Sequence, residues 1–349
     1  MLDADIRLRL ERLSLDAAVT VGAGEVVALL GPNGSGKSTV LRALSGLLRL
    51  DQGRIELDGT VLDDPAERVR VPAEKRPVAL MFQDYLLFPH MTAVENVAFG
   101  PRAQKMDRGA ARQKAMAALD RLGLAAVAQA RPGAMSGGQQ QRVAMARALV
   151  TDPRLLLLDE PLAALDVSTK NDLRRYLRPV LRESSAANIL VTHDLLDAVA
   201  LADRMVVIEK GAIVQTGTPA EVTARPRSEY VADLVGMNLL RGRAEGTGLA
   251  VDGGGQLIIG EPASGPVLAV VPPAAVSVSR TQPDGTAANV WPAQIAGVDL
   301  MGDRVRVRLD GQPRLSAEVP PGAVDEFKLD DGGQMWAAVS AADIRVYPA

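Results

Sequence analysis

The sequence predicts an α/β domain with a helical insertion, followed by a small all-β barrel domain. Two observations predict the first domain. A strand, a glycine-rich loop and a helix follow one another over residues 26–48, and the apolar run 155–158 ends at two adjacent carboxylates. The third observation is a change of composition after residue 236, where glycine, proline and valine become frequent and short alternating strands replace the helical pattern.

The glycine-rich loop matches the pattern G-x-x-x-x-G-K-[ST] in the strand, loop and helix context that this motif requires. It consists of Gly31, Pro32, Asn33, Gly34, Ser35, Gly36, Lys37, Ser38 and Thr39. The glycines allow successive backbone N–H groups to turn toward one anion, and the following helix adds its positive dipole end. We expect Lys37 to reach the β- and γ-phosphates of a nucleotide and Ser38 to bind Mg²⁺. A glycine-rich surface turn is the alternative.

Composition limits the chemistry that the chain can perform. No cysteine is present, and the only histidines are His90 and His193, so catalysis must use carboxylates, amides or phosphate-bound Mg²⁺. A net charge of −3 gives no electrostatic reason to expect a nucleic-acid partner. No run approaches the ~20 apolar residues of a membrane span, and the N-terminus lacks the pattern of a signal peptide. We therefore expect the protein in the cytoplasm.

The chain before the loop alternates apolar and charged residues over positions 6–10 and continues a similar pattern over 15–21, which predicts an antiparallel strand pair. After the first helix, residues 55–57 predict a strand and Asp58-Gly59 a tight hairpin turn. A further strand over residues 78–82 ends at Gln83.

A helical insertion is predicted at about residues 85–150, where an alanine-rich helical stretch is broken at Arg131-Pro132-Gly133. Within it, Ser136-Gly137-Gly138-Gln139 precedes another helix. Ser136 and Gln139 fit a capping box, and the glycines leave N–H groups at the helix start uncovered, which attracts anions. A capped helix without a ligand is the alternative.

Two later strands carry polar residues at their ends. The buried run 155–158 delivers Asp159 and Glu160 to the carboxyl edge of the sheet, where ligands bind in open α/β folds. Asp159 suits a Mg²⁺ site, and Glu160 suits a general base toward water. The strand over residues 188–192 delivers His193 to the same edge, although a histidine at a strand end can also be merely structural.

These motifs, together with Gln83 and Ala164-Leu165-Asp166, occur in the order of the ATP-binding cassette family, which residues 5–230 resemble. The resemblance implies a P-loop ATPase with a RecA-like core and a helical subdomain. It also implies a head-to-tail homodimer that sandwiches two ATP molecules with Mg²⁺. In each site, one subunit's loop would meet Ser136, Gly137, Gly138, Gln139 and Asp166 of the other.

The same resemblance implies roles for individual side chains. Gln83 contacts Mg²⁺ and water and acts as a sensor toward a membrane partner, and His193 holds the γ-phosphate. The implied catalytic residues are therefore Glu160, His193 and Gln83, and the implied metal site consists of Ser38, Gln83 and Asp159.

Two positions depart from the family's pattern. Met135 replaces the usual leucine, which conserves volume and apolar character. The family usually stacks adenine on an aromatic residue near the first strand, but no aromatic residue precedes Phe82. Arg12 or Leu13 would have to substitute, and we assign neither.

The C-terminal third resembles the oligomer-binding-type (TOBE) β-barrel that is appended to import ATPases, and residues of about 288–347 resemble a molybdate-binding, Mop-like module. Three segments carry the latter resemblance: Asn289-Val290-Trp291-Pro292-Ala293, the strand at 304–309, and Pro320 to Phe327. We therefore predict a nucleotide-binding domain at 1–235 and a regulatory barrel domain at 236–349, which is a possible oxyanion site.

The resemblance as a whole implies an ATPase subunit, peripheral on the cytoplasmic face of the inner membrane, that energises import of an oxyanion, with molybdate as the expected solute. Its implied partners are integral-membrane permease subunits and, indirectly, a periplasmic or lipid-anchored substrate-binding protein. Importers of sulfate, polyamines, iron or sugars are the alternative. A soluble cassette ATPase acting on DNA or ribosomes and a passive oxyanion-storage protein are the other classes considered.

Overall fold

The computed structural model describes residues 1–11, 13–163, 165–283 and 288–349. Arg12, a candidate contact of adenine, and Ala164 lie outside the described residues, as do residues 284–287. The chain divides into two compact units, residues 1–220 and 221–349, and each is described by itself. The domain boundary expected between residues 235 and 236 stays a prediction. In the described part of the chain, no helix has the length and apolar character needed to cross a bilayer.

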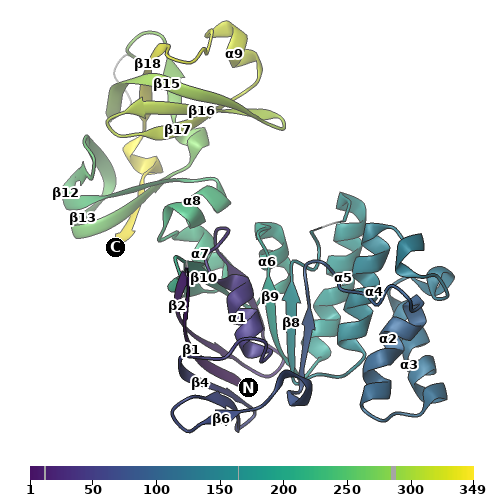
Figure 1. Cartoon of the computed structure of the whole chain (residues 1–349). Coiled ribbons are helices and arrows are strands. Elements are labelled where there is room, and N and C mark those ends of the chain that lie inside the picture. Colours follow the sequence, from purple (N-terminus) through teal and green to yellow (C-terminus); the bar gives the residue numbers. More distant parts are fainter. Residues whose placement is uncertain (12, 164, 284–287) are drawn as a thin grey trace. The chain divides into compact units, whose positions relative to one another are not determined.

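A mixed sheet forms the centre of the first unit, with eleven strands within the described residues in the order β6-β5-β4-β1-β2-β11-β10-β3-β9-β8-β7 (Figure 1). The strands are β1 (Leu2–Leu10), β2 (Leu13–Val21), β3 (Val26–Leu30), β4 (Gln52–Leu57), β5 (Thr60–Asp64), β6 (Val69–Arg70), β7 (Val78–Met81), β8 (Leu155–Asp159), β9 (Ala187–Val191), β10 (Arg204–Glu209) and β11 (Ala212–Gly217). Strands β10, β3, β9, β8 and β7 are parallel. The expected antiparallel pair, β1 with β2, is confirmed, and so is the hairpin from β4 to β5.

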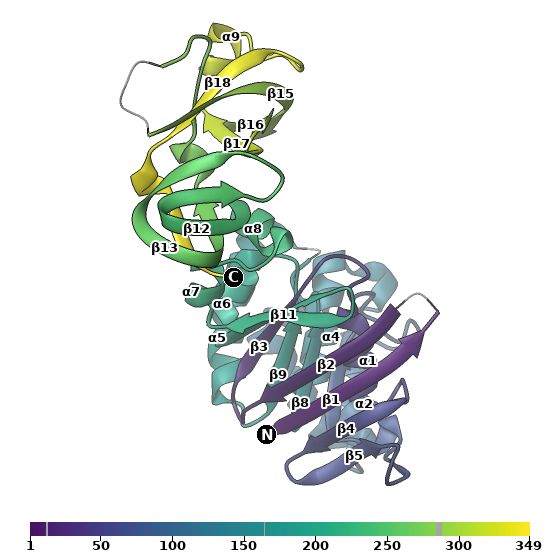
Figure 2. The same cartoon turned by 90° about the vertical axis from the view of Figure 1, so that its left-hand side faces the viewer.

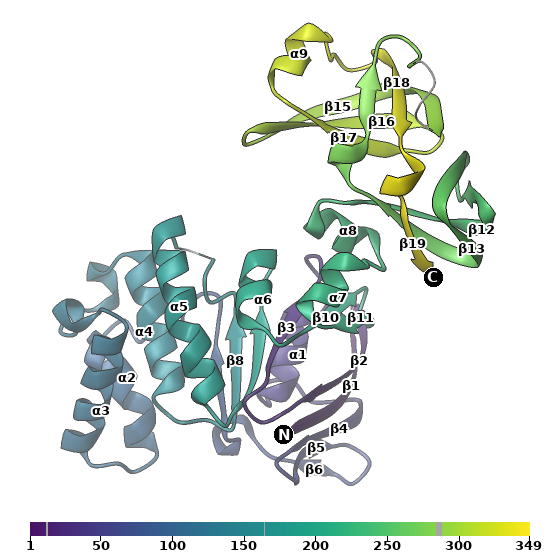
Figure 3. The same ribbon diagram turned by 180° about the vertical axis from the view of Figure 1, so that it is seen from behind.

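Helix α1 (Lys37–Leu44) lies between the parallel strands and the antiparallel strands (Figure 1, Figure 3). Its buried residues Val40, Leu41 and Leu44 share one core with residues of β1, β4, β3 and β8. On β8, Leu155 and Leu157 face this core, whereas Leu156 and Leu158 face a second core beneath the helices. Burial on both faces explains why this strand is a continuous apolar run.

The predicted helical insertion contains α2 (Ala93–Ala103), α3 (Arg108–Arg121) and α4 (Gly137–Leu149), with the short turns η2 (Ala125–Val127) and η3 (Pro132–Ala134) between the last two. These helices gather at the β7 edge of the sheet, where α4 contacts β7 (Figure 1). The other helical segments before residue 236 are η1 (Ala73–Lys75), α5 (Val167–Glu183), α6 (Leu195–Leu201), α7 (Pro219–Ala224) and α8 (Glu229–Val235).

The second unit contains two sheets that share one core. The first pairs β12 with β13 and β13 with β19, and Figure 2 shows the strong curvature of the β12 and β13 ribbons. The second has the order β14-β18-β15-β16-β17. The elements are β12 (Asn238–Val251), β13 (Gln256–Val271), η4 (Pro273–Ala275), β14 (Ser277–Ser279), β15 (Asn289–Met301), β16 (Arg304–Gly311), β17 (Leu315–Val319), α9 (Gly322–Glu326), β18 (Gln334–Val339), η5 (Ala341–Asp343) and β19 (Arg345–Pro348).

The predicted all-β character of this unit is confirmed, and its described residues form two sheets around one core. The strand pairing is long-range, and no local pattern reveals it. The final strand β19 returns to β13, with Leu268 opposite Tyr347. The Asn289 side chain also joins the sheets, because its Nδ2 donates to the carbonyl of Ile258 at 2.9 Å and to that of Val339 at 3.3 Å.

The C-terminal end of α1 is held by Arg76, whose side chain is completely buried. Its guanidinium donates to the carbonyls of Ala43 and Leu44 and to Asp63 Oδ2, at 3.0 Å in each case. Carbonyls of a helix's last turn have no partner within the helix, and they carry its negative dipole end. Arg76 therefore holds α1 at its C-terminal end. Glycine is required at position 46, since a Cβ there would lie 2.6 Å from Arg76 Nε.

We predict that Arg76→Met lowers the free energy of unfolding of the first unit by about 3–5 kcal/mol, because it leaves the buried Asp63 carboxylate without its counter-charge. Urea unfolding followed by far-UV circular dichroism measures this loss. Both tryptophans, Trp291 and Trp336, lie in the second unit, so the transition followed by tryptophan fluorescence should not move.

The matched control is Arg175→Met, which removes a pair between Arg175 and Asp172 whose side chains are 80% and 69% exposed. Exposed pairs contribute at most about 1 kcal/mol, so this variant should unfold close to the wild type. Equal destabilisation by the two substitutions would contradict the role given to Arg76.

Candidate nucleotide site

The glycine-rich loop joins β3, in which every residue is buried, to the start of α1. Gly31 has φ 152°, and a Cβ at this position would lie 2.0 Å from the carbonyl oxygen of Ile208, so only glycine fits. Gly36 caps α1 with φ 114° and without a side-chain hydrogen bond. The first N–H groups of α1 thus have no side-chain cap, and they lie where a helix favours an anion.

Lys37 is 8% exposed and folds back over the loop. Its Nζ donates to the carbonyl oxygens of Gly31 at 2.7 Å and of Pro32 at 2.9 Å. Burial lowers the pKa of Lys37, and the charges of Glu160 and Asp159 oppose that shift. A buried ammonium that donates to neutral carbonyls suits a phosphate, which would supply a counter-charge.

Ser38 and Asp159 lie together where α1 begins and β8 ends, and the Ser38 hydroxyl hydrogen-bonds the Asp159 carboxylate. Asp159 is 9% exposed, and burial raises its pKa, although the bond from Ser38 opposes the shift. Hydroxyl and carboxylate oxygens are ligands that Mg²⁺ prefers. These two residues therefore fit a magnesium ion that also binds phosphate.

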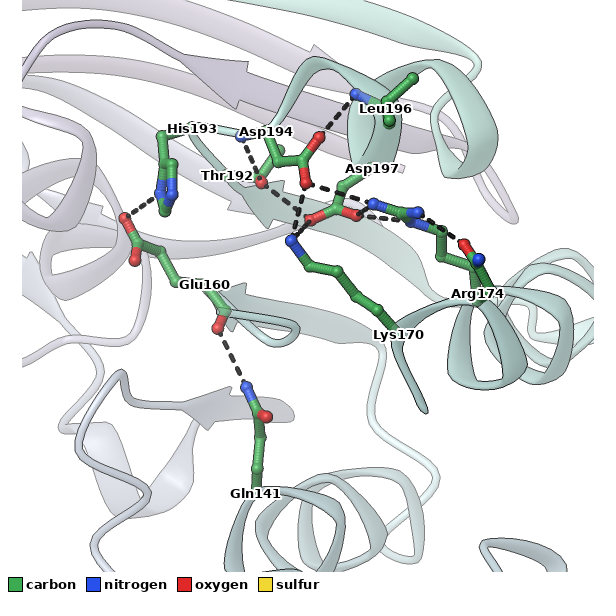
Figure 4. Close-up of polar contacts among 10 residues, drawn as sticks. Gln141, Glu160, Lys170, Arg174, Thr192, His193, Asp194, Leu196 and Asp197 are labelled. Carbon is green, nitrogen blue, oxygen red and sulfur yellow. Dashed lines mark hydrogen bonds and ion pairs between the residues drawn. The ribbon is translucent and has the colours of Figure 1, made fainter. Parts of the chain in front are cut away.

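Gln83, Glu160 and His193 come together at the carboxyl ends of the neighbouring parallel strands β7, β8 and β9. The distance from His193 Nδ1 to Glu160 Oε1 is 3.1 Å, and that from Gln83 Nε2 to Glu160 Oε2 is 3.4 Å. Figure 4 shows the side chains of His193 and Glu160 pointing toward one another. Because β3 lies next to β9 in the sheet, the glycine-rich loop leaves the sheet at the same edge.

The backbone of Glu160 is also held. Its φ of 48° lies in the left-handed region, which is uncommon for a residue other than glycine. Its N–H donates to the carbonyl of Val191 at 3.0 Å, and its own carbonyl accepts from Gln141 Nε2 at 3.3 Å (Figure 4). These contacts tie Glu160 to the neighbouring strand and to α4.

Sequence reasoning missed Gln141, which is fully buried. Its spacing offered a signal, because Gln141, Met145 and Ala148 follow one another at four and three residues along α4 and all lie on its buried face. A polar residue on such a face needs a hydrogen-bond partner, and that partner is the carbonyl of Glu160.

The predicted capping box at the start of α4 is confirmed. Ser136 Oγ accepts from the Gln139 N–H at 3.3 Å, and Gln139 Oε1 accepts from the Ser136 N–H at 2.9 Å. Ser136 and Gly137 are exposed, and a Cβ on Gly137 would have no neighbour within 4 Å. A Cβ on Gly138 would lie 2.8 Å from Leu165. The start of α4 is thus presented to solvent, with Leu165 beside it.

Asp166 is the N-cap of α5, and its polar contacts are made within that helix end. It accepts hydrogen bonds from the Ser168 hydroxyl at 2.5 Å and from the N–H and hydroxyl of Thr169 at 2.9 and 2.7 Å. These bonds, that from Ser168 foremost, hold the pKa of Asp166 well below its usual range.

Leu13, the described candidate for the adenine contact, begins β2 and lies beside the loop. A Cβ on Gly36 would be 3.3 Å from Leu13 Cδ2. Its aliphatic side chain offers packing area but no aromatic face for stacking.

Comparison with known proteins agrees with this geometry. The family model described as "ABC transporter" matches residues 15–163, and the model described as "TOBE domain" matches residues 285–346. The "Molybdenum import ATP-binding protein ModC" of Mycobacterium tuberculosis (strain ATCC 25618 / H37Rv) is 41% identical, over 96% of this chain and 94% of that protein. The "Sulfate/thiosulfate import ATP-binding protein CysA" of Burkholderia mallei (strain ATCC 23344) is 38% identical, again over 96% and 94%.

A solved structure extends the comparison to three dimensions. The dimer of the ATP-binding cassette MJ0796 in a post-hydrolysis state, bound to ADP and Pi, is 28% identical with a TM-score of 0.55, covering 63% of this chain and 99% of that one. Motif order, strand-end geometry and near full-length similarity agree, and the protein described here belongs to the ATP-binding cassette transporter family and carries a C-terminal TOBE domain.

Proposed function

We propose that this chain is the ATP-hydrolysing subunit of an importer whose solute is molybdate. The observation that carries the proposal is the convergence of Glu160, His193 and Gln83 at the sheet edge that the phosphate loop also leaves. Passive binding of a nucleotide or an oxyanion would not need a carboxylate held between two polar side chains. The similarity to a molybdenum import ATP-binding protein over 96% of the chain supports the choice of solute.

The reaction is in-line attack of water on the γ-phosphate of ATP. Lys37 binds the β- and γ-phosphates by exchanging the carbonyls of Gly31 and Pro32 for phosphate oxygens. Backbone N–H groups at the start of α1 bind the same phosphates without moving, since Gly31 and Gly36 already hold the loop in its turn. Ser38 and Asp159 would hold a Mg²⁺ ion, which would supply positive charge to neutralise the phosphates.

Glu160 orients the attacking water and accepts its proton as a general base. Its carboxylate has one oxygen near His193 and the other near Gln83, so its plane is fixed before the substrate arrives. His193, whose side chain is 62% exposed, can also reach the γ-phosphate.

We propose a head-to-tail homodimer in which each nucleotide is covered by the start of α4 of the other subunit. The exposure of Ser136 and Gly137 supports this arrangement, because the uncrowded helix start can approach a second chain. Asp166 at the start of α5 is exposed as well and is placed at the same seam. The dimeric state of the MJ0796 cassette supports the pairing.

The segment over residues 85–91 is the proposed contact for the permease, because it follows Gln83 directly. It has a defined shape: Arg147 donates to the carbonyls of Tyr85 and Leu86 at 2.8 Å, and Asn96 Oδ1 accepts from the Phe88 N–H at 2.8 Å. Leu86 is nevertheless 54% exposed. An ordered segment with an exposed apolar side chain suits a helix of a membrane partner. On this basis we propose that the chain lies at the cytoplasmic face of the membrane.

Importers of sulfate or of iron are the second candidate for the solute. The similarity to the sulfate/thiosulfate protein is nearly as high as that to the molybdenum protein. In the proposed importer, the pocket that selects a solute would lie in partner proteins. The TOBE domain bears on the question only if it binds the transported anion itself.

We predict that Glu160→Gln lowers kcat for ATP hydrolysis by at least about 100-fold while ATP binding persists. The amide has the shape of the carboxylate but cannot accept a proton from the attacking water. Steady-state ATPase assays and equilibrium binding of ATP measure the two effects. The control Glu183→Gln removes an exposed carboxylate of α5 and should leave kcat unchanged. Wild-type turnover of Glu160→Gln would sink the assignment.

A mixed dimer tests the composite site. Chains with Ser136→Arg and chains with Lys37→Ala each lack one half of every site in a homodimer, but a mixed dimer retains one complete site of two. We expect ATP hydrolysis only in the mixed sample. Purification by two different affinity tags isolates that species, and equal rates in all three samples would refute action in trans.

The C-terminal unit has two candidate roles, reinforcement of the dimer and feedback by bound oxyanion. The Asn289 side chain is already used to join the two sheets, so an anion near it would have to bind backbone N–H groups. For feedback, the anion must bind the open dimer more tightly than the closed one, and a ~tenfold preference shifts that equilibrium by only about 1.4 kcal/mol.

Partial inhibition by molybdate is therefore expected of the full transporter. The measurement is ATPase activity against added molybdate, for the full chain and for a chain that ends at Val235. Inhibition confined to the full chain supports feedback, whereas equal behaviour of the two chains would leave the C-terminal unit as a dimerisation element.

A further inference from the structure

Four charged side chains lie directly behind His193 and form a cluster of two cations and two anions. Lys170 and Arg174 come from α5, and Asp194 and Asp197 come from the start of α6 and the loop before it (Figure 4). Lys170 Nζ lies 2.7 Å from Asp194 Oδ2, and Arg174 Nη2 lies 3.2 Å from the same oxygen. Arg174 Nε also donates to Asp197 Oδ1 at 2.6 Å.

The cluster encloses the backbone that carries His193. Thr192 Oγ1 donates to Asp197 Oδ2 at 3.3 Å and accepts from the Asp194 N–H at 3.1 Å. The residues on both sides of His193 are therefore fixed to the cluster, while the imidazole itself contacts Glu160. Thr192 and Asp197 are each 3% exposed, so this part of the network is shielded from water.

Helix α5 connects the two cations of the cluster to Asp166. Asp166, Lys170 and Arg174 are spaced four residues apart, so they lie along one face of α5. Asp166 caps the helix, and the two cations follow one turn and two turns later. Backbone hydrogen bonds make successive turns of a helix move together. A displacement of the Asp166 end of α5 therefore also displaces Lys170 and Arg174.

We propose that Arg174 and Asp197 are positioning residues that hold His193 against Glu160 and link its position to the Asp166 end of α5. The inference rests on the proposed function, in which Glu160 and His193 act on the γ-phosphate and Asp166 lies at the dimer seam. None of the four charged residues touches the phosphates in this role. Their effect on hydrolysis passes through the imidazole.

The expected consequence is specific to the chemical step. If the carboxylate of Asp197 is lost, Arg174 keeps one anionic partner, and the loop over residues 192–194 is held less closely. Displacement of the imidazole by a fraction of an ångström weakens its contact with Glu160. Lys37, which binds the phosphates, is anchored to Gly31 and Pro32, outside the cluster.

The first test observes His193 directly, in the full-length chain without nucleotide. The protein has only two histidines, so ring signals in a histidine-labelled NMR spectrum are assigned with His90→Gln. We expect Asp197→Asn to shift or broaden the His193 ring signals and to leave those of His90 in place. The matched control is Asp172→Asn, which breaks the exposed pair of Asp172 with Arg175 on the same helix and should move neither.

The second test is a double-mutant cycle on ATP hydrolysis. In the wild-type background, Asp197→Asn should lower kcat about tenfold with little change in KM. In the His193→Ala background, it should change the remaining kcat by less than about twofold, because a residue that acts through the imidazole has nothing left to position. Where Asp197→Asn lowers the unfolding temperature below that of the assay, Lys170→Met replaces it at the edge of the cluster.

An unchanged His193 spectrum in Asp197→Asn would overturn the inference, and so would an equal loss of kcat in both backgrounds. Failure of the proposed function has a different signature, in which the wild type does not hydrolyse ATP or His193→Ala has full activity. The NMR result then still decides whether the cluster positions the ring.

Discussion

The structure depends on the way in which α1 is held. Its apolar side chains are enclosed between the parallel and antiparallel strands, and Arg76 satisfies the carbonyls at its C-terminal end from a buried position. The opposite end is left without a side-chain cap. One end of the helix dipole is thus neutralised inside the protein while the other is free to bind an anion. The proposed phosphate site needs no rearrangement of the loop, because Gly31 and Gly36 already hold the backbone in its turn.

The order of the parallel strands explains why distant residues of the sequence meet. β7, β8 and β9 are neighbours, so residues that directly follow these strands fall at one edge of the sheet. Gln83, Glu160 and His193 are separated by 77 and 33 residues along the chain but lie within hydrogen-bond distance. Whether these side chains meet depends on their positions along the strands, since a shift of one residue would turn a side chain to the other face of the sheet.

Local patterns predicted most of the candidate site, because most of its parts can be recognised from a short stretch of sequence. The loop motif, the capping box of Ser136 with Gln139, and the apolar run before Glu160 each depend on neighbouring residues. Gln141 and the cluster around Arg174 were missed because their partners come from other elements, whose relative register no short window contains. The C-terminal unit was predicted least well for the same reason, since β19 pairs with a strand about eighty residues earlier.

Some residues of the candidate site are fixed by contacts within one chain, whereas others are exposed and can contact a second chain. Glu160 and His193 are fixed by contacts within the chain, whereas Ser136 and Asp166 are exposed at the starts of α4 and α5. In the proposed dimer, a second surface contributes binding free energy only when the two chains close, so hydrolysis can depend on the state of a partner. Both exposed helix starts lead back to the catalytic edge: α4 reaches the backbone of Glu160 through Gln141, and α5 reaches the loop of His193 through Arg174. Glu160 and His193, two of the three proposed catalytic residues, therefore each have a structural connection to the surface at which the second chain would arrive.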